Sequence, residues 1–262
     1  MSGEINWDPI RDLAQRVFER GESLELTEDT RSLLIRTAQE AGIDQQTAER
    51  ALSNETTAST LLEETIQRIN EGSDRLSDAL LQMYDLRDKG NLEGACQLMR
   101  DLLTVEVVPL YRRQAEGMLE ELTGLAEVNV TGRVSAHLPD RPQLAILERR
   151  LQQGHTLELT DDLRALLRRT APTAAFSEAE TEEALKSPQG AAALMGGILS
   201  RFREGKQRIT HALYRMTILR DAGDLEGARQ QMRDVLAVEV VPQYRQMAEE
   251  NLAGLDRPFP KP

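Results

Sequence analysis

Apolar residues recur along most of the chain at three- and four-residue spacing, which places them on one face of a helix. The longest such pattern predicts a helix from about Thr60 to Lys89, interrupted at Glu71-Gly72. Its apolar positions are Leu62, Ile66, Ile69, Leu76, Leu80, Met83 and Leu86. Only 3% of the residues are aromatic, whereas strands prefer aromatic and β-branched side chains. The sequence therefore predicts an all-α protein.

Residues typical of helix ends place the shorter elements. A first helix opens at Asp8-Pro9, with Asp as its cap, and Gly21 can close it in a left-handed conformation. A second helix is expected after Thr27 and a short third helix after Asp44. The corresponding signals in the second half of the chain are Thr160 and the capping box of Ser177 and Glu180.

A proline divides the last predicted helical region of the first half. A helix that starts after Asn91 meets Pro109, whose ring clashes with the carbonyl oxygen four residues earlier. We therefore expect the helix to kink or restart near Val107-Val108, with a final segment that contains Tyr111 packing after it.

The helical pattern occurs twice. Residues 90–116 and 223–249 align without a gap at an offset of 133, and 19 of these 27 positions are identical. We predict two tandem copies of a helical domain, each with about five helices and ending in a tetratricopeptide-like hairpin. The predicted ranges are 8–124 for the first copy, 125–140 for a linker without helical period, 141–255 for the second copy and 256–262 for a Pro-rich tail.

Several strings of the repeat are familiar when taken together. They are [Ser/Thr]-Leu-Glu-Leu-Thr, Arg-Thr-Ala, Leu-Arg-Asp-x-Gly-[Asn/Asp]-Leu-Glu-Gly-Ala, Met-Arg-Asp and Val-Glu-Val-Val-Pro-x-Tyr-Arg. The unit resembles the DUSAM domain, a paralogous family of gliding, multicellular soil bacteria without an assigned biochemical function. The resemblance implies a small cytoplasmic helical domain and brings no catalytic residues with it.

Charge and composition narrow the classes of function. The 262 residues include 44 Asp and Glu but 32 Lys and Arg, a net charge of −12, which repels phosphate backbones and argues against nucleic acid as a partner. The chain shows neither an apolar run long enough to span a bilayer nor a secretory signal, so no membrane partner is expected. Its single cysteine, Cys96, agrees with a reducing compartment. We expect a cytoplasmic protein.

Residue types common in catalytic and metal sites lack the neighbours that such sites need. Cys96 aligns with Arg229 in the other copy, and His137, His155 and His211 align with no histidine. The chain has no C-x-x-C, H-E-x-x-H, EF-hand or Walker A spacing, and no Glu stands three residues before a His, as a di-iron bundle requires. We therefore predict no catalytic residue, no metal site and no cofactor.

The string Val-Glu-Val-Val-Pro-x-Tyr-Arg is the strongest candidate for a functional role. A Glu among three valines must be paired, protonated or exposed, so it either reaches solvent at the kink or pairs with Arg112 or Arg100. A second interpretation is a partner-contact patch, since Tyr and Arg are common interface anchors. A third is acid/base chemistry by the Glu. The candidate patch consists of Glu106, Tyr111 and Arg112 and, in the second copy, Glu239, Tyr244 and Arg245.

These features favour a non-enzymatic adaptor or regulatory protein that binds an unidentified protein partner. A narrower form of this hypothesis is an antitoxin or immunity protein, because an acidic helical protein suits a basic toxin. The alternative is an enzyme with an unrecognised site based on carboxylate or tyrosine. We also expect the two copies to pack on each other as an intramolecular pseudo-dimer.

Overall fold

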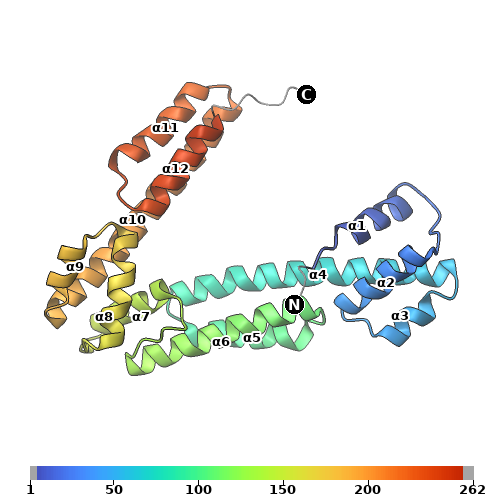
Figure 1. Cartoon of the computed structure of the whole chain (residues 1–262), viewed down its shortest axis with the longest axis horizontal. Coiled ribbons are helices and arrows are strands. Elements are labelled where there is room, and N and C mark those ends of the chain that lie inside the picture. The colour runs from blue at the N-terminus through green and yellow to red at the C-terminus, as the bar shows by residue number, and fades with distance from the viewer. Residues whose placement is uncertain (1–4, 256–262) are drawn as a thin grey trace. The chain divides into compact units, whose positions relative to one another are not determined.

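The computed structural model describes residues 5–255, and within this range every regular element is helical (Figure 1). The prediction of an all-α protein is therefore confirmed. The predicted Pro-rich tail, 256–262, lies outside the described residues. Internal contacts divide the chain into two compact units after Thr123. No helix in the described range is long and apolar enough to cross a membrane.

Unit 1 is built around one long helix. Its helices are α1 (Asp8–Ala14), continued by a π-helical turn (Gln15–Glu19), α2 (Glu28–Glu40), α3 (Gln45–Ala51), α4 (Glu55–Asp88), α5 (Leu92–Val105) and α6 (Pro109–Thr131), whose last turns belong to unit 2. The three short helices contact α4, and α2 and α3 lie beside its N-terminal half, while α5 runs back along its C-terminal half (Figure 1). The α4–α5 pair is the predicted hairpin.

Unit 2 repeats this arrangement. It contains α7 (Asp140–Gln152), α8 (Asp161–Thr170), a 3-10 turn (Pro172–Ala174), α9 (Glu178–Ala184), α10 (Pro188–Asp221), α11 (Leu225–Val238) and α12 (Pro242–Leu255). Again the short helices pack on the long helix, α10, and α11 packs between α10 and α12. The tandem repeat is confirmed, with six α-helices per copy where about five were expected.

Side-chain caps start most of these helices at the predicted positions. Thr27 and Asp44 accept the backbone N–H three residues later, as does Asn91 at the start of α5. The expected capping box of Ser177 and Glu180 is present in unit 2. These bonds satisfy donors that a helix leaves unpaired in its first turn.

The first helix begins differently from the prediction. Asp8 is its first residue and not its cap, and the preceding residue, Trp7, makes no side-chain capping bond. Instead, the side-chain oxygen of Asn6 accepts the Asp8 N–H at 2.8 Å. At the C-terminal end, Gly21 has the expected left-handed conformation, with φ +70°, where the chain leaves the helical turns.

Two predicted breaks are helical. α4 continues through Glu71-Gly72 for 34 residues, so the expected interruption is wrong. α6 continues to Thr131, so the first part of the predicted 125–140 linker is helix, held by buried Leu125 and Val128. In both places packing outweighs weak local preference, which is only a prior for secondary structure.

The remainder of the predicted linker is fixed by one buried side chain. Gln143, on α7, accepts the Ser135 N–H at 2.7 Å and donates to the carbonyl oxygens of Ser135 and Leu138 at 2.9 and 3.0 Å. A fully buried amide with these partners ties the 132–139 segment to α7 within unit 2.

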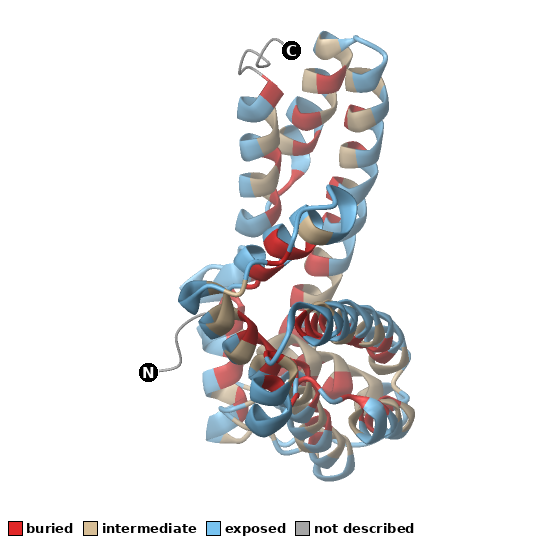
Figure 2. Cartoon of the chain, turned by 90° about the vertical axis from the view of Figure 1, so that its right-hand side faces the viewer, coloured by how far each residue is buried: buried red, intermediate tan, exposed pale blue. Residues whose placement is uncertain are grey.

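Buried residues follow the inward face of each helix (Figure 2). The core is aliphatic, as composition predicts, with large buried side chains such as Ile69, Met83, Met99 and Leu166. Two carboxylates are also buried in the described range, Glu106 and Glu239, which are 1% and 2% exposed. Since a buried carboxylate needs compensating partners, these two residues mark the position from which a site must be built.

Candidate functional site

Glu106 turns inward at the break between α5 and α6. Its backbone is extended, with φ −75° and ψ 127°, immediately after α5 ends at Val105. One carboxylate oxygen accepts the N–H groups of Val107 and Val108 at 2.9 and 2.7 Å. Because Pro109 has no N–H to offer, the carboxylate binds the last free donors before α6 begins.

The partner of this carboxylate comes from the long helix. Nη2 of Arg75, on α4, lies 3.2 Å from the second oxygen of Glu106, and its Nε lies 3.3 Å away. The predictions that Glu106 reaches solvent or pairs with Arg112 or Arg100 are therefore wrong. Arg75 precedes Glu106 by 31 residues, and the only sequence signal for it is that the other copy also has Arg, at position 208.

The tyrosine and the arginine of the string are also structural. Arg112 donates to the backbone oxygens of Leu103 and Glu106, both at 2.7 Å, and so satisfies carbonyl groups at the C-terminal end of α5. The buried Tyr111 hydroxyl donates to the Ile69 carbonyl oxygen at 3.1 Å. Burial raises the pKa of the Tyr111 phenol. A phenol held in its protonated form is a poor base.

Unit 2 repeats these contacts. Glu239 accepts the N–H groups of Val240 and Val241 at 3.0 and 2.8 Å and pairs with Arg208 of α10. Arg245 donates to the backbone oxygens of Leu236 and Glu239, each at 2.8 Å. Tyr244 is buried, and desolvation raises its pKa as well.

A glycine in the long helix makes room for each of these clusters. A Cβ atom on Gly72 would lie 2.6 Å from Cδ2 of Tyr111 and 3.0 Å from a carboxylate oxygen of Glu106. Gly205 meets Tyr244 and Glu239 in the same way. Glycine is therefore required in both long helices for close packing, although it is a weak helix former.

The candidate patch is consequently not presented to a partner. Glu106, Glu239 and both tyrosines are buried, and the arginines are bound to backbone oxygens. The structure brings the predicted residues together as a brace that joins the long helix to the break after α5 or α11. Because these side chains are bound to one another and to the backbone, their arrangement supports neither an active site nor a binding surface.

Apolar side chains that the predicted patch did not include lie exposed beside each brace. Val105 and Val107 flank Glu106, and Val238 and Val240 flank Glu239. On the long helices, Leu81 is 70% exposed and its counterpart Tyr214 is 66% exposed. The sequence signal for them was that both copies carry apolar residues at these positions when they are aligned at the offset of 133.

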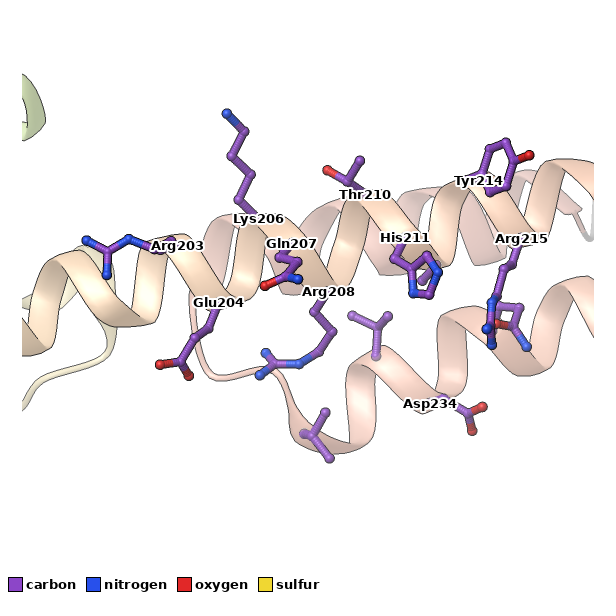
Figure 3. A pocket seen from close by; sticks show the side chains of 14 residues that line it. Arg203, Glu204, Lys206, Gln207, Arg208, Thr210, His211, Tyr214, Arg215 and Asp234 are labelled. Atoms are coloured by element: carbon purple, nitrogen blue, oxygen red, sulfur yellow. The ribbon is translucent and has the colours of Figure 1, made fainter. Parts of the chain in front are cut away.

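In unit 2, Tyr214 and Val238 line a groove between α10 and α11, which we call the α10–α11 groove (Figure 3). Its volume is about 1240 Å³. Figure 3 shows Arg208 and His211 pointing from α10 toward α11, while Lys206 and Tyr214 rise from the opposite edge of α10. The lining residues are Arg203, Glu204, Lys206, Gln207, Arg208, Thr210, His211, Ala212, Tyr214, Arg215, Gln231, Asp234, Val235 and Val238.

The groove continues over the buried ion pair. A second hollow of about 410 Å³ shares Glu204, Arg208 and Val238 with it and is also lined by Glu239. The predicted residue Glu239 thus lies at the edge of the groove.

The corresponding surface of unit 1, which we call the α4–α5 face, differs in charge. The groove has four Lys and Arg against two Asp and Glu, whereas the α4–α5 face has one Arg against four Asp and Glu. At the offset of 133, the face consists of Asn70, Glu71, Ser73, Asp74, Arg75, Ser77, Asp78, Ala79, Leu81, Gln82, Leu98, Asp101, Leu102 and Val105.

The same asymmetry extends over the whole units. Residues 1–123 contain 13 Lys and Arg and 25 Asp and Glu, a net charge of −12, whereas residues 124–262 contain 19 of each. The acidity of the chain therefore belongs to unit 1. The argument against anionic partners that rests on total charge applies to unit 1 and not to the α10–α11 groove.

Residues associated with metal or thiol chemistry are not gathered at this groove. Within the described range, no group of three or more His, Cys, Asp or Glu side chains could hold a metal ion. His211 is the only histidine or cysteine among the residues that line the groove, and Cys96 is buried in unit 1.

Comparison with known proteins identifies the family. A family model described as protein of unknown function (DUF2379) matches residues 5–122 and again residues 139–255. No curated protein and no solved structure matches the chain. The two matches cover nearly all of the described residues and coincide with the internal repeat. The chain therefore belongs to the DUF2379 family and carries two tandem copies of its domain.

Proposed function

We propose that this chain is a non-enzymatic adaptor or regulatory protein, and that its binding surfaces are the α10–α11 groove and the α4–α5 face. The supporting observation is that the two copies keep the same buried brace but carry opposite charge on corresponding outer surfaces. Two similar scaffolds with different surfaces suit a protein that makes two different contacts.

The chemistry of the groove is suited to protein recognition. It combines exposed Tyr214 and Val238 with arginines; aromatic and Arg side chains are enriched at interface centres, which are more apolar than the rest of the surface. Its open form between two helices fits an amphipathic helix, which would place its apolar face on these side chains.

No observation favours the enzymatic alternative. Its site was expected to use a carboxylate or a tyrosine, and the two such residues of the candidate patch in unit 1, Glu106 and Tyr111, are engaged inside the protein. The raised pKa of Tyr111 opposes a role as a base.

An antitoxin or immunity role and a cytoplasmic location are part of this proposal. An antitoxin or immunity protein would use acidic unit 1 against a basic toxin, because complementary charge speeds association and excludes wrong partners. A cytoplasmic location in a bacterium of the kind that carries DUSAM domains agrees with the repeat strings and the single cysteine.

Affinity capture from a lysate of the source cell tests the proposal. The tagged full chain is compared with Tyr214→Ser/Val238→Ser in unit 2 and with Leu81→Ser/Val105→Ser in unit 1. All four side chains are exposed, so we expect no loss of thermal stability and loss of a stoichiometric partner from at least one double variant.

The matched control is Phe18→Ser/Val130→Ser, which removes two exposed apolar side chains that line neither surface. It should retain the partner. The proposal is wrong if the wild type captures no stoichiometric partner, or if the control and the surface variants retain it equally.

A further inference from the structure

We propose that the α10–α11 groove binds the α4–α5 face of a second copy of this chain, so that unit 1 of one molecule docks on unit 2 of another. This inference rests on the proposed function, because it names the occupant of the proposed binding surface. The arguments are the charge and the shape of the two surfaces.

The charges of the two surfaces are complementary. Lys206 and Arg215 line the groove, and no acidic side chain in the described range is paired with either of them. On the α4–α5 face, Asp74 and Asp78 are exposed, and no basic side chain in the same range is paired with them. Each surface therefore carries charges that lack an intramolecular counterion.

The apolar centres of the two surfaces correspond in position. Val105 and Val238 are 57% and 60% exposed at the ends of α5 and α11, and Leu81 and Tyr214 are exposed one helix away. The long helices both have 34 residues, and α5 and α11 both have 14. Two surfaces with the same framework can pack with their apolar centres together in a nearly symmetric contact.

Charge selects which surfaces meet. Two α4–α5 faces would bring Asp74 and Asp78 against like charges, and two grooves would bring Lys206 and Arg215 together. Like charges across an interface oppose association, whereas the mixed pair places opposite charges around an apolar centre. The favoured contact is therefore between unlike units.

Complementary charge reversal of the full chain tests this contact. One variant, Lys206→Glu/Arg215→Glu, makes the groove acidic, and the other, Asp74→Lys/Asp78→Lys, makes the α4–α5 face basic. We expect purified wild type to self-associate in sedimentation velocity over two decades of concentration, and each variant alone to do so at least about tenfold more weakly.

The decisive sample is a mixture of the two variants. In the mixture, the unchanged groove of the Asp74→Lys/Asp78→Lys variant can bind the unchanged face of the Lys206→Glu/Arg215→Glu variant. The acidic groove of the second variant can also bind the basic face of the first. Association should return to the wild-type level. Raising salt from 0.1 to 1 M shortens the Debye length from about 10 to about 3 Å and should weaken the wild-type complex.

The control is Arg113→Glu/Lys186→Glu, which changes net charge by the same amount as the groove variant, at exposed positions outside both surfaces. It should associate like wild type. A wild type that remains monomeric throughout, or a mixture that does not recover, overturns the inference.

The two proposals fail in different ways. If the purified chain is monomeric but a different protein is captured through the same surface residues, the proposed function stands and the self-docking inference is wrong. If neither self-association nor a captured partner is found, both are wrong.

Discussion

The guanidinium of Arg75 binds the carboxylate of Glu106, a residue that lies 31 positions later and is fully enclosed by the protein. This ion pair joins the middle of α4 to the break between α5 and α6. The other oxygen of the carboxylate binds two backbone N–H groups, so the charge is compensated on both sides. The same pair recurs between Arg208 and Glu239 in unit 2.

Removal of Arg75 should destabilise unit 1. In Arg75→Leu the carboxylate stays buried but loses its cationic partner, and a hydrogen bond to a charged group is worth about 2 kcal/mol. We expect the free energy of unfolding to fall by that amount in urea titration. The matched control is Arg100→Leu on the exposed surface of α5, which should change it by less than about 0.5 kcal/mol. Equal effects of the two substitutions would show that the ion pair contributes nothing.

Alanine at Gly72 should be destabilising despite its higher helix propensity. The new Cβ would lie 2.6 Å from the Tyr111 ring, and overpacking of this kind costs about 1–3 kcal/mol. Gly117 is the control, since it is helical with nothing within 4 Å of its Cβ position. Gly117→Ala should stabilise by up to about 1 kcal/mol. Thermal unfolding that shifts in the same direction for both variants would contradict the close contact.

Ala175 is the only non-glycine residue in the described range with positive φ, at 61°, and Gly42 occupies the same place in unit 1 with φ +79°. We expect Ala175→Gly to stabilise the protein by about 0.5–1 kcal/mol, because it relieves left-handed strain. The reverse change, Gly42→Ala, should destabilise it, since the added Cβ would also meet the backbone of Val107. Urea unfolding of both variants measures this; a loss of stability in Ala175→Gly would contradict it.

Alkaline pH should destabilise the fold through two tyrosines. Burial raises the pKa of Tyr111 and Tyr244 above the ordinary value of about 10. As pH rises past 10, the phenols ionise in the unfolded state but stay protonated in the folded state, so the free energy of unfolding decreases. Well below that pH both phenols are protonated in the folded and the unfolded state, so their ionisation adds no pH dependence to the free energy of unfolding.

Tyrosinate absorbance measures this effect directly. The folded chain should show a component that titrates late, and Tyr111→Phe/Tyr244→Phe should lack it. If the wild type and the double variant show the same late component, burial of these phenols does not control their ionisation.

Most helix starts could be predicted because their causes are local. Thr27, Asp44 and Asn91 bind N–H groups three residues ahead, and Pro109 forces a restart within its own turn. Such interactions depend on a few neighbouring residues and on backbone sterics. The repeat, the fold class and the break after α5 follow from the same kind of information.

Whether the residues of the repeated string are buried or exposed depended on the tertiary structure. Whether Glu106 is buried or exposed depends on whether Arg75 and Gly72 of another helix meet it, and that is decided only when α4 and α5 pack together. Likewise, the exposed Val105 and Val238 became recognisable as surface residues only because the neighbouring glutamates turned inward. The sequence by itself determined the helices and their duplication; packing between residues distant in sequence decided which side chains form the interior and which remain available to a partner.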